Sequence, residues 1–387
     1  MAPTGHNSVN SDSEITLYCA HFAGKVYTLT LSNSGGKYTL TETGSVDLPG
    51  RPSWLTYDEH TKLLYVNDEE LEKKEGVLSV LEVGAENKLS VKTIAQVPWA
   101  GVASTLYGGE NANSFIANAH YSAATVSAYP LPLSSEPTPL HKFEYTIPQP
   151  GANPERQEAP HPHHILADPF GAFIIVPDLG ADLVRVYKID RDSGNLTPLD
   201  PIEAAVKGNG PRHAIFWKSA PSSLEDNKRL HEGTWLYVAN ELANTVDVYA
   251  VTYDADLNPS FSLKQTISTY GDKPAPSTST LAAIKVKDND MYVSNRRDAA
   301  FKPCDSLTHF SIDPSNGLLT FKELSSTHGS NPRAFEISPV GDLVAITNKG
   351  TDNLAIVKRD TVTGSLGEKV AEAKINGSGG LSAVVFV

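Results

Sequence analysis

A short apolar run that ends in a polar residue recurs along the whole chain. Each copy has about four apolar residues, and the long patterns with a 3.6-residue period that mark helices are nearly absent. Successive polar ends lie 46 to 62 residues apart. A repeat of this length without a helical period indicates a repeated unit of strands. The polar ends are His21, Asn67, Asn118, Asp178, Asn240, Asn295 and Asn348.

Further strand patterns accompany each run. A third strand follows it, as at Leu183–Tyr187 and Val246–Tyr249, and then a less regular fourth one, as at Leu319–Leu324. Four strands repeated about every 55 residues along 387 residues predict an all-β, seven-bladed β-propeller with four antiparallel strands in each blade. About ten residues before the run lies a first strand, often followed by turn residues. These first strands are predicted at Ser53–Asp58, Ser104–Gly109, His163–Pro169, Arg212–Lys218, Thr280–Lys287 and Arg333–Pro339.

The two ends of the chain complement each other. The repeat that begins with Ile15–Leu31 lacks a first strand, whereas Leu381–Val387 has the pattern of a first strand with nothing after it. We expect this last strand to complete the N-terminal blade, which closes the ring without an open sheet edge. The expected organisation is a flexible N-terminal tail over residues 1–14 and a single propeller domain over residues 15–387, although length alone favours two or three domains.

Composition narrows the partners and the compartment. The chain has 32 Lys and Arg against 45 Asp and Glu, a net charge of −13, and no basic block, which argues against nucleic acid and anionic membranes. No apolar run approaches the roughly 20 residues of a membrane span. The start of the chain lacks a signal-peptide core, and only two cysteines occur, Cys19 and Cys304. These features favour the cytoplasm, with secretion as the alternative if a signal peptide was removed, and they leave the oligomeric state open.

The repeat also predicts where functional side chains gather. First and second strands are antiparallel neighbours, so first-strand starts and second-strand ends share one face, and first strands line the channel. We call this face the channel mouth. Asn is common at the second-strand ends, where it indicates hydrogen bonding in a turn. A residue that the repeats share in this way is structural, so the residues that differ from the repeat are the functional candidates. The charged and histidine residues in these positions include Arg51, His120, His163, Arg212, Glu241, Arg296, Arg297, Arg333 and Lys349.

The densest histidine cluster is His161-Pro162-His163-His164. A zinc site is one interpretation, but the spacing matches no established ligand pattern, so no metal is expected. Alternation along a strand directs His161 and His163 one way and His164 toward the packed interior. His163 is a candidate general base or acid because imidazole titrates near neutral pH.

The other candidates suggest electrostatic chemistry. Arg212 offers a fixed cation for a carboxylate, a phosphate or a developing oxyanion, or else forms a surface salt bridge, and the neighbouring His213 is expected to pack. Glu241 offers a carboxylate or is a solvated loop acid. Arg296 and Arg297 offer guanidinium groups or are solvated on the rim. No G-x-S-x-G, P-loop or G-x-G-x-x-G motif occurs, so no nucleotide or other cofactor is expected.

A series of motifs spans the middle and end of the chain. They are Arg156-Gln157-Glu158, Pro160-His161-Pro162-His163, Asp178-Leu179-Gly180-Ala181-Asp182, Gly210-Pro211-Arg212-His213, Asn240-Glu241-Leu242, Ser294-Asn295-Arg296 and Asn331-Pro332-Arg333. Together they resemble the lactonase family of seven-bladed propellers, which includes bacterial-type 6-phosphogluconolactonases and fungal carboxy-cis,cis-muconate cyclases. The resemblance implies an active site of one His, two Arg and one Glu at the channel mouth. The matching residues here are the catalytic candidates His163, Arg212, Glu241 and Arg296, with His161, Arg333, Arg297, His120 and Lys349 as expected substrate-binding residues.

The function that the resemblance implies is hydrolysis of an anionic or sugar-derived lactone, such as 6-phosphogluconolactone or an aldonolactone. His163 or Glu241 would activate water, and the arginines would stabilise the oxyanion. The alternatives are a lactonising cycloisomerase of the carboxy-cis,cis-muconate type and a non-catalytic binding propeller. The chain departs from the family pattern after Arg296, where it has Arg297-Asp298-Ala299-Ala300 and an apparent insertion at Phe301–Asp305, so its substrate can differ from the family's best-known one.

Overall fold

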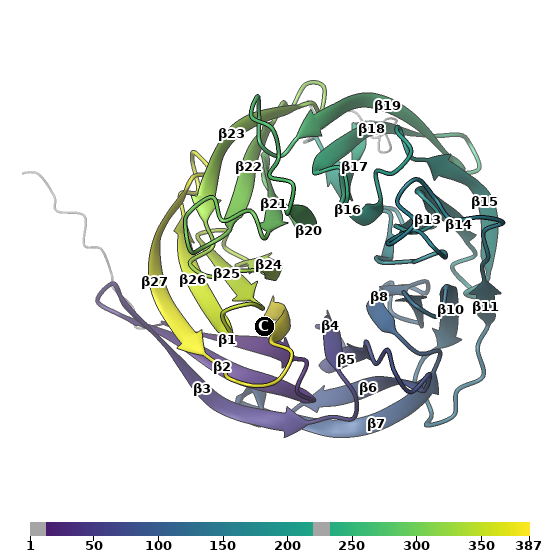
Figure 1. The fold of residues 1–387 in the computed structure, drawn as a ribbon. Helices are drawn as coiled ribbons and strands as arrows, with labels where there is room; N and C mark the ends of the chain where they lie inside the picture. Colours follow the sequence, from purple (N-terminus) through teal and green to yellow (C-terminus); the bar gives the residue numbers. More distant parts are fainter. Residues whose placement is uncertain (1–12, 220–232) are drawn as a thin grey trace, which may run out of the picture.

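The chain folds into a ring of seven antiparallel sheets, each with four strands, arranged around a common centre (Figure 1). The computed structural model describes residues 13–219 and 233–387. In these ranges the only helical element is a single 3₁₀ turn, η1, at Ala85–Asn87. The all-β, seven-bladed propeller predicted from the repeat is therefore confirmed.

The blades follow one another along the chain. Blade 1 contains β28 (Leu381–Phe386), β1 (Ser13–His21), β2 (Lys25–Ser34) and β3 (Lys37–Asp47). Blade 2 contains β4 (Pro52–Asp58), β5 (Leu63–Asp68), β6 (Gly76–Val83) and β7 (Leu89–Val97). Blade 3 contains β8 (Gly101–Tyr107), β9 (Phe115–His120), β10 (Thr125–Pro130) and β11 (His141–Glu144). Blade 4 contains β12 (Leu166–Ala167), β13 (Phe173–Asp178), β14 (Leu183–Ile189) and β15 (Leu196–Glu203).

The remaining three blades have the same order of strands. Blade 5 contains β16 (Pro211–Lys218), β17 (Thr234–Asn240), β18 (Thr245–Tyr253) and β19 (Pro259–Ser268). Blade 6 contains β20 (Thr280–Lys287), β21 (Asp290–Arg296), β22 (Ser306–Ile312) and β23 (Leu319–Ser326). Blade 7 contains β24 (Pro332–Ile337), β25 (Leu343–Asn348), β26 (Asn353–Arg359) and β27 (Leu366–Lys374).

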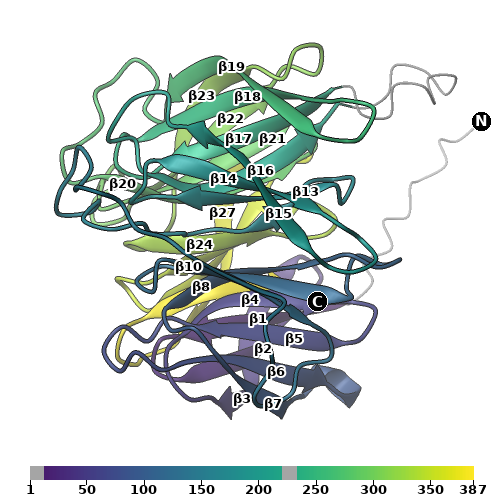
Figure 2. The ribbon, with the colours of Figure 1, turned by 90° about the vertical axis from the view of Figure 1, so that its right-hand side faces the viewer.

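The last strand closes the ring as predicted. β28 pairs antiparallel with β1, with Cys19 opposite Val384. In the side view, the loop that leads into β20 projects from one face of the ring, and the C-terminus lies toward the other (Figure 2). The expected tail boundary at residue 14 is wrong by two residues, because β1 begins at Ser13. The rest of the expected tail lies outside the described residues, and the single-domain organisation stays a prediction.

Blade 4 departs from the predicted pattern. The expected first strand His163–Pro169 is reduced to the two residues of β12, with one isolated bridge between Pro162 and Asp178. Pro162 has no N–H to donate to the sheet. The backbone N–H of His161 is donated to the side-chain carboxylate of Asp178 at 2.6 Å instead of to a backbone carbonyl of the neighbouring strand. The three histidines of this segment therefore lie on an irregular stretch of backbone beside β13.

Packing between neighbouring blades explains why the second strands are apolar almost throughout. All six residues of β5, β13 and β25 are buried, because each of these strands is covered on both faces. Leu17 and Leu29 of blade 1, for example, pack with Leu343 and Ile356 of blade 7. Each blade thus shares its apolar core with the next one around the ring.

Tyrosine hydroxyls add a polar link between blades. Each of four buried tyrosines donates a hydrogen bond to a backbone carbonyl in the turn between the third and fourth strands of the next blade. The three glycine acceptors are buried, and a buried carbonyl needs such a partner, so these bonds help to fix the spacing of neighbouring blades. The pairs are Tyr18 with Asn87, Tyr107 with Gly194, Tyr237 with Gly317 and Tyr292 with Gly364.

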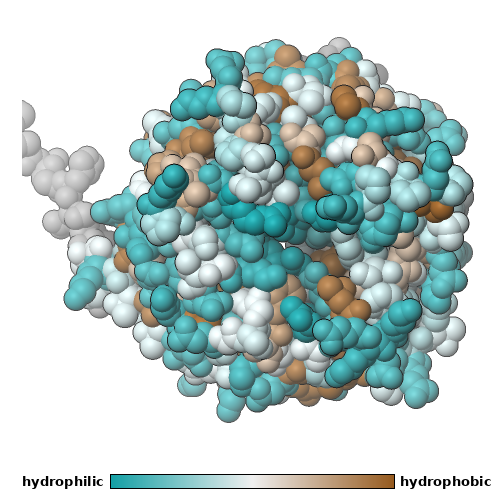
Figure 3. Space-filling model, in the orientation of Figure 1, coloured by the Kyte–Doolittle hydropathy of each residue, from teal (hydrophilic) through white to brown (hydrophobic). Residues whose placement is uncertain are grey.

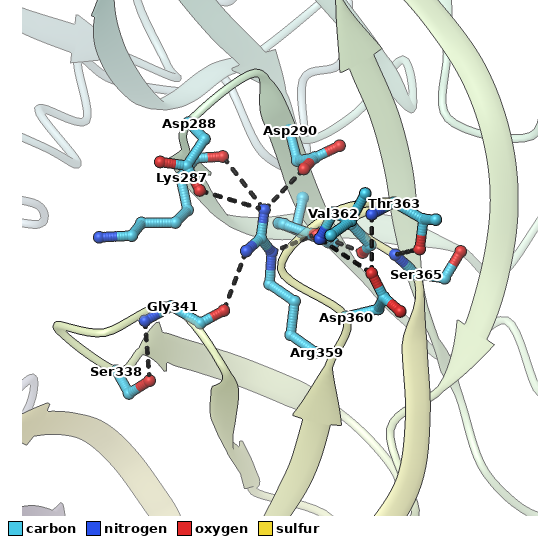
Figure 4. Close-up of polar contacts among 12 residues, drawn as sticks. Lys287, Asp288, Asp290, Ser338, Gly341, Arg359, Asp360, Val362, Thr363 and Ser365 are labelled. Atoms are coloured by element: carbon cyan, nitrogen blue, oxygen red, sulfur yellow. Dashed lines mark hydrogen bonds and ion pairs between the residues drawn. The ribbon is translucent and has the colours of Figure 1, made fainter. Parts of the chain in front are cut away.

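Arg359 forms a buried polar link between blades 6 and 7 (Figure 4). The residue is only 3% exposed. It forms an ion pair with Asp290 at 2.6 Å and donates to the Tyr292 hydroxyl at 2.8 Å and to the Gly341 carbonyl at 2.9 Å. Asp290 starts β21 and Arg296 ends it, so this link lies at the end of the blade opposite the channel mouth.

Substituting Arg359→Met is expected to lower the free energy of unfolding by about 3–5 kcal/mol. The reason is that Asp290 and the Gly341 carbonyl lose a buried partner. Chemical denaturation measures the change. Asp288→Asn is the matched control, because Asp288 lies 3.6 Å from the same guanidinium but its side chain is 61% exposed. Its substitution should lower the free energy of unfolding by less than about 1 kcal/mol. Equal losses in the two variants would show that the Asp290 link is not the stabilising one.

Candidate active site

The observed register brings first-strand starts and second-strand ends together. Pro211 lies opposite Asn240, Thr280 opposite Arg296, and Pro332 opposite Asn348. Residues next to these positions therefore meet at one mouth of the ring. In the orientation of Figure 1, hydrophilic side chains gather around the centre of this face (Figure 3).

Glu241 is the centre of the site. It follows β17 directly, and its N–H is donated to the Gly210 carbonyl at 2.8 Å, so the strand pairing of blade 5 fixes its position. Three guanidinium groups surround its carboxylate. Oε1 lies 2.8 Å from Arg156 and 3.0 Å from Arg296, and Oε2 lies 2.8 Å from Arg212. Both carboxylate oxygens are thus occupied by cations.

This arrangement settles the charge of Glu241. Its side chain is only 2% exposed, and burial alone raises the pKa of a carboxyl group. The charges of Arg296, Arg212 and Arg156 outweigh burial and lower the pKa of Glu241 to about 2. Glu241 is therefore an ionised anchor that holds three cations close together against their mutual repulsion.

Arg212 is the most deeply buried of these cations, at 1% exposure. It enters from the start of β16, and its Nη1 donates to the Ala282 carbonyl in β20 at 2.6 Å. Arg296 ends β21, and its Nη2 donates to the Leu281 carbonyl at 2.8 Å. Burial, and then the neighbouring charge of Arg296, lowers the pKa of Arg212 well below its usual range. The two guanidinium groups therefore have fixed orientations before any ligand arrives.

His163 faces the same cations from blade 4. Its N–H is donated to the Pro177 carbonyl at 2.9 Å, and its ring meets Tyr121 edge-on at 5.4 Å between centroids. Burial, and then the charges of Arg212 and Arg333, lowers the pKa of His163 well below its usual range. Its Nδ1 has no hydrogen-bond partner within the described part of the chain. His163 is thus a neutral imidazole beside the guanidinium cluster.

His161 and Tyr121 form the wall next to His163. The two rings stack with centroids 4.1 Å apart. The imidazole of His161 is also in contact with Glu158 through Nε2 at 2.9 Å and with the Tyr121 carbonyl through Nδ1 at 3.1 Å. The expected substrate-binding residue His161 therefore lies beside the site, where its own partners orient it.

Arg156 is a site residue that the repeat did not identify. It lies in the long segment between β11 and β12, outside the two repeated positions, and reaches Glu241 and the Tyr121 hydroxyl. The sequence pointed to this residue only through the motif Arg156-Gln157-Glu158, which is one of the motifs that resemble the lactonase family.

Arg333 and Lys349 lie at the same mouth, on blade 7. Arg333 forms an ion pair with Glu69, and Lys349 lies with its Nζ 4.8 Å from the centroid of the Phe22 ring. Arg333 also lowers the pKa of His163, so its charge reaches the imidazole. These two residues connect the Glu241 cluster to the opposite side of the mouth.

The structure does not bring His120 and Arg297 into this cluster. His120 is fully buried and is hydrogen-bonded to Ser127 at 2.8 Å inside blade 3, so its expected substrate contact is wrong. Its position at the end of β9 turns its ring toward β10. Arg297 is exposed on the rim, with its Nη2 3.0 Å from the Thr280 hydroxyl and its N–H donated to Asp305. A solvated rim position was one of the two interpretations of this residue.

His164 and His213 pack behind the mouth. Their rings stack with centroids 4.5 Å apart, and Trp54 meets both edge-on. The three neighbouring histidines 161, 163 and 164 therefore have different partners. In the described residues, no group of three or more His, Cys, Asp or Glu side chains is arranged to hold a metal ion.

Four of the buried histidines, His120, His163, His164 and His213, make the fold sensitive to acid. Burial is the largest cause that lowers the pKa of each, to about 3 for His120 and His164 and well below the usual range for His163 and His213. The unfolded chain titrates near pH 6.5, so below that pH it binds protons that the folded chain does not. The free energy of unfolding is therefore expected to fall below pH 6.5 by roughly 1.4 kcal/mol per pH unit for each histidine.

Chemical denaturation at pH 7.5, 6 and 5 measures this slope. His164→Phe keeps an aromatic ring beside Trp54. In this variant the free energy of unfolding is expected to fall less steeply with decreasing pH, by the contribution of one histidine. His60→Phe is the control, because His60 is exposed. A slope that is the same in all three proteins would contradict the prediction.

Fold and site together define a class: a seven-bladed propeller with a guanidinium-bound carboxylate and a neutral imidazole at one channel mouth. Residues 14–385 match the family model described as Lactonase, 7-bladed beta-propeller, and the chain therefore belongs to this family. In the described ranges, no helix is long and apolar enough to cross a membrane.

Curated relatives and solved structures agree with this assignment. A probable 6-phosphogluconolactonase of Arthroderma benhamiae is 30% identical over 89% of this chain and 82% of its own length. The 6-phosphogluconolactonase of Bacillus subtilis is 27% identical over 89% of this chain and 93% of its own length. Among solved structures, the periplasmic gluconolactonase PpgL of Pseudomonas aeruginosa superposes with a TM-score of 0.79 at 23% identity, covering 97% of this chain and 99% of the other.

Proposed function

We propose that this chain hydrolyses an anionic or sugar-derived lactone, of which 6-phosphogluconolactone is the leading candidate and an unphosphorylated aldonolactone the second. The observation that carries the proposal is Glu241, which holds three guanidinium groups beside the neutral imidazole of His163. The names of the relatives support opening of a lactone rather than the closing reaction of a cycloisomerase.

His163 is the proposed base. Water donates a proton to the imidazole while its oxygen attacks the lactone carbonyl carbon, which creates a tetrahedral oxyanion. An anionic ligand in the mouth offsets the field of Arg212, Arg296 and Arg333, so it raises the pKa of His163 toward the range in which imidazole accepts a proton. Substrate binding itself thus makes the base more effective.

Arg212 and Arg296 are the proposed oxyanion partners. Both are buried, and Glu241 together with backbone carbonyls fixes their orientation. Fixed cations stabilise charge that develops in the transition state without reorganising at that moment. When the tetrahedral state collapses, the bond between the carbonyl carbon and the ring oxygen breaks. The ring oxygen then takes the proton from the His163 imidazole to become a hydroxyl, which returns His163 to its neutral form, and the carboxylic acid product releases one proton to solution.

Glu241 is not the base in this scheme. A carboxylate with a pKa of about 2 and cations on both oxygens has little tendency to accept a proton from water. Of the two bases that the sequence left open, the geometry favours His163.

Proton release tests the proposal. Freshly prepared glucono-1,5-lactone is added with and without a 6-phosphate, and the rate is corrected for spontaneous hydrolysis. We expect the protein to accelerate ring opening of at least one of the two. If neither is accelerated, the hydrolase proposal fails. The alternatives are then a cycloisomerase and a non-catalytic binding propeller. A cycloisomerase would be detected by the loss of the absorbance of a conjugated diene.

We also propose that the protein is cytoplasmic. Cys19 and Cys304 are both free thiols, which suits a reducing compartment. Fractionation of source cells tests this, and recovery from the secreted fraction would contradict it. The expected absence of nucleic-acid and membrane partners also stays a prediction.

A further inference from the structure

A second group of cations occupies the part of the mouth formed by blades 7, 1 and 2. It surrounds Phe22, which directly follows β1 and is 5% exposed. The guanidinium carbons of Arg51 and Arg333 lie 5.1 and 5.0 Å from the centroid of the Phe22 ring, and the Nζ of Lys349 lies 4.8 Å from it. We call these four residues the Phe22 cation cluster.

The cluster has more positive than negative charge. Glu69 forms an ion pair with Arg333. In the described chain, Arg51 and Lys349 have no ion pair, and the buried Nε of Arg51 has no hydrogen-bond partner. Burial, and then the charge of Arg333, lowers the pKa of Lys349; Glu69 opposes this effect, and Arg51 adds a smaller one in the lowering direction. An aromatic face attracts cations but does not cancel their mutual repulsion, so an anion among them would relieve it.

The surrounding backbone holds this arrangement. The Arg51 N–H is donated to the buried carboxylate of Asp68 at 2.6 Å. The loop before β28 passes close to the cluster, and the Phe22 N–H is donated to the Gly380 carbonyl at 3.0 Å. Gly379 has a φ of +94°, and a Cβ there would lie 2.7 Å from the Phe22 Cβ and 3.4 Å from the Arg51 guanidinium. Glycine lets the backbone approach the cluster without filling the space beside its cations.

Arg333 joins the two halves of the mouth. It belongs to the Phe22 cation cluster, and its charge also lowers the pKa of His163 and that of Arg296. The positive potential of the mouth therefore continues from the side of His163 through Arg333 to the Phe22 cation cluster. In a phosphorylated sugar lactone, the phosphate is attached to the carbon next to the ring, several bonds from the carbonyl carbon, so one molecule presents both groups.

We propose that Arg51, Arg333 and Lys349, arranged around Phe22, bind the phosphate of a sugar lactone phosphate while its carbonyl lies at His163 and Arg212. This assignment rests on the proposed function and narrows its substrate to the phosphorylated class. Glu69 forms the ion pair that holds Arg333 in place.

The test is the preference for phosphate, measured as the ratio of kcat/KM for glucono-1,5-lactone 6-phosphate to kcat/KM for the unphosphorylated lactone. Lys349→Met and Arg51→Met are each expected to lower this ratio about tenfold to hundredfold, mainly through KM, the size expected for one charge-assisted contact. Lys349→Arg is expected to retain most of the preference. Lys62→Met is the control, because Lys62 lies over the Tyr57 ring in the β4–β5 turn, away from the mouth. It should leave the ratio unchanged.

Binding of inorganic phosphate separates this proposal from the proposed function. Calorimetric titration at constant ionic strength is expected to show phosphate binding to the native chain that weakens at least tenfold in the Lys349→Met and Arg51→Met variants. If no lactone is opened but phosphate binding is lost in these variants, the hydrolase proposal fails and the anion site stands. If the native chain shows no preference for the phosphorylated lactone, or if the variants keep the native preference and the native phosphate affinity, the phosphate assignment is overturned.

Discussion

The His163→Gln variant is expected to lose about 10²- to 10⁴-fold in kcat for lactone opening, the usual contribution of a general base. The buried imidazole has a ring nitrogen without a partner in the described part of the chain, whereas Glu241 is held by three guanidinium groups. Proton release under saturating lactone measures kcat, and KM is expected to change little because the cations that hold the ligand remain.

Two controls make this result specific to the base. His60→Gln removes an exposed imidazole and should leave kcat unchanged. The free energy of unfolding of His163→Gln should fall less between pH 7.5 and pH 5 than that of the native chain, because the variant lacks one imidazole that is protonated only in the unfolded chain. A folded His163→Gln variant that retains native kcat would exclude His163 as the base.

The second large effect is expected on stability. Glu241→Gln removes the one carboxylate that holds Arg156, Arg212 and Arg296 together, and it leaves buried cations uncompensated. Breaking a buried pair in this way costs about 3–5 kcal/mol in the free energy of unfolding. Activity is expected to fall as well, because the two proposed oxyanion partners lose their common anchor.

Denaturant unfolding of Glu241→Gln beside Glu158→Gln measures this effect. Glu158 is 54% exposed and contacts His161, so its loss should cost less than about 1 kcal/mol. Adding Arg296→Met to Glu241→Gln is expected to recover part of the lost stability, since one uncompensated cation is removed. A Glu241→Gln variant as stable as the native chain would show that the guanidinium groups do not depend on this carboxylate.

The repeat in the sequence was sufficient for the architecture. Strands buried on both faces require apolar residues throughout, so the runs at β5, β13 and β25 are visible without any structure. The first strand displaced to the C-terminus predicts the pairing of β28 with β1. The repeat also placed His163, Arg212, Glu241 and Arg296 at one mouth, because antiparallel neighbours share an end.

Only the tertiary structure decided what these side chains do. A repeat gives the position of a residue at the mouth, but the direction of its side chain depends on local backbone and packing. His120 occupies a mouth position in the sequence and turns into blade 3, whereas Arg156 lies outside the repeat and reaches Glu241 from a long loop.

The charges of the site likewise depend on contacts between distant segments. Glu241 is held by cations from three separate segments, and Phe22 is surrounded by residues 29, 311 and 327 positions away. The pKa of a buried group is the balance of desolvation against such neighbours, and neither contribution can be read from the order of residues. The sequence by itself thus determined the ring and the mouth, and the folded chain decided which group anchors the cations, which group is the proposed base and where the proposed phosphate site lies.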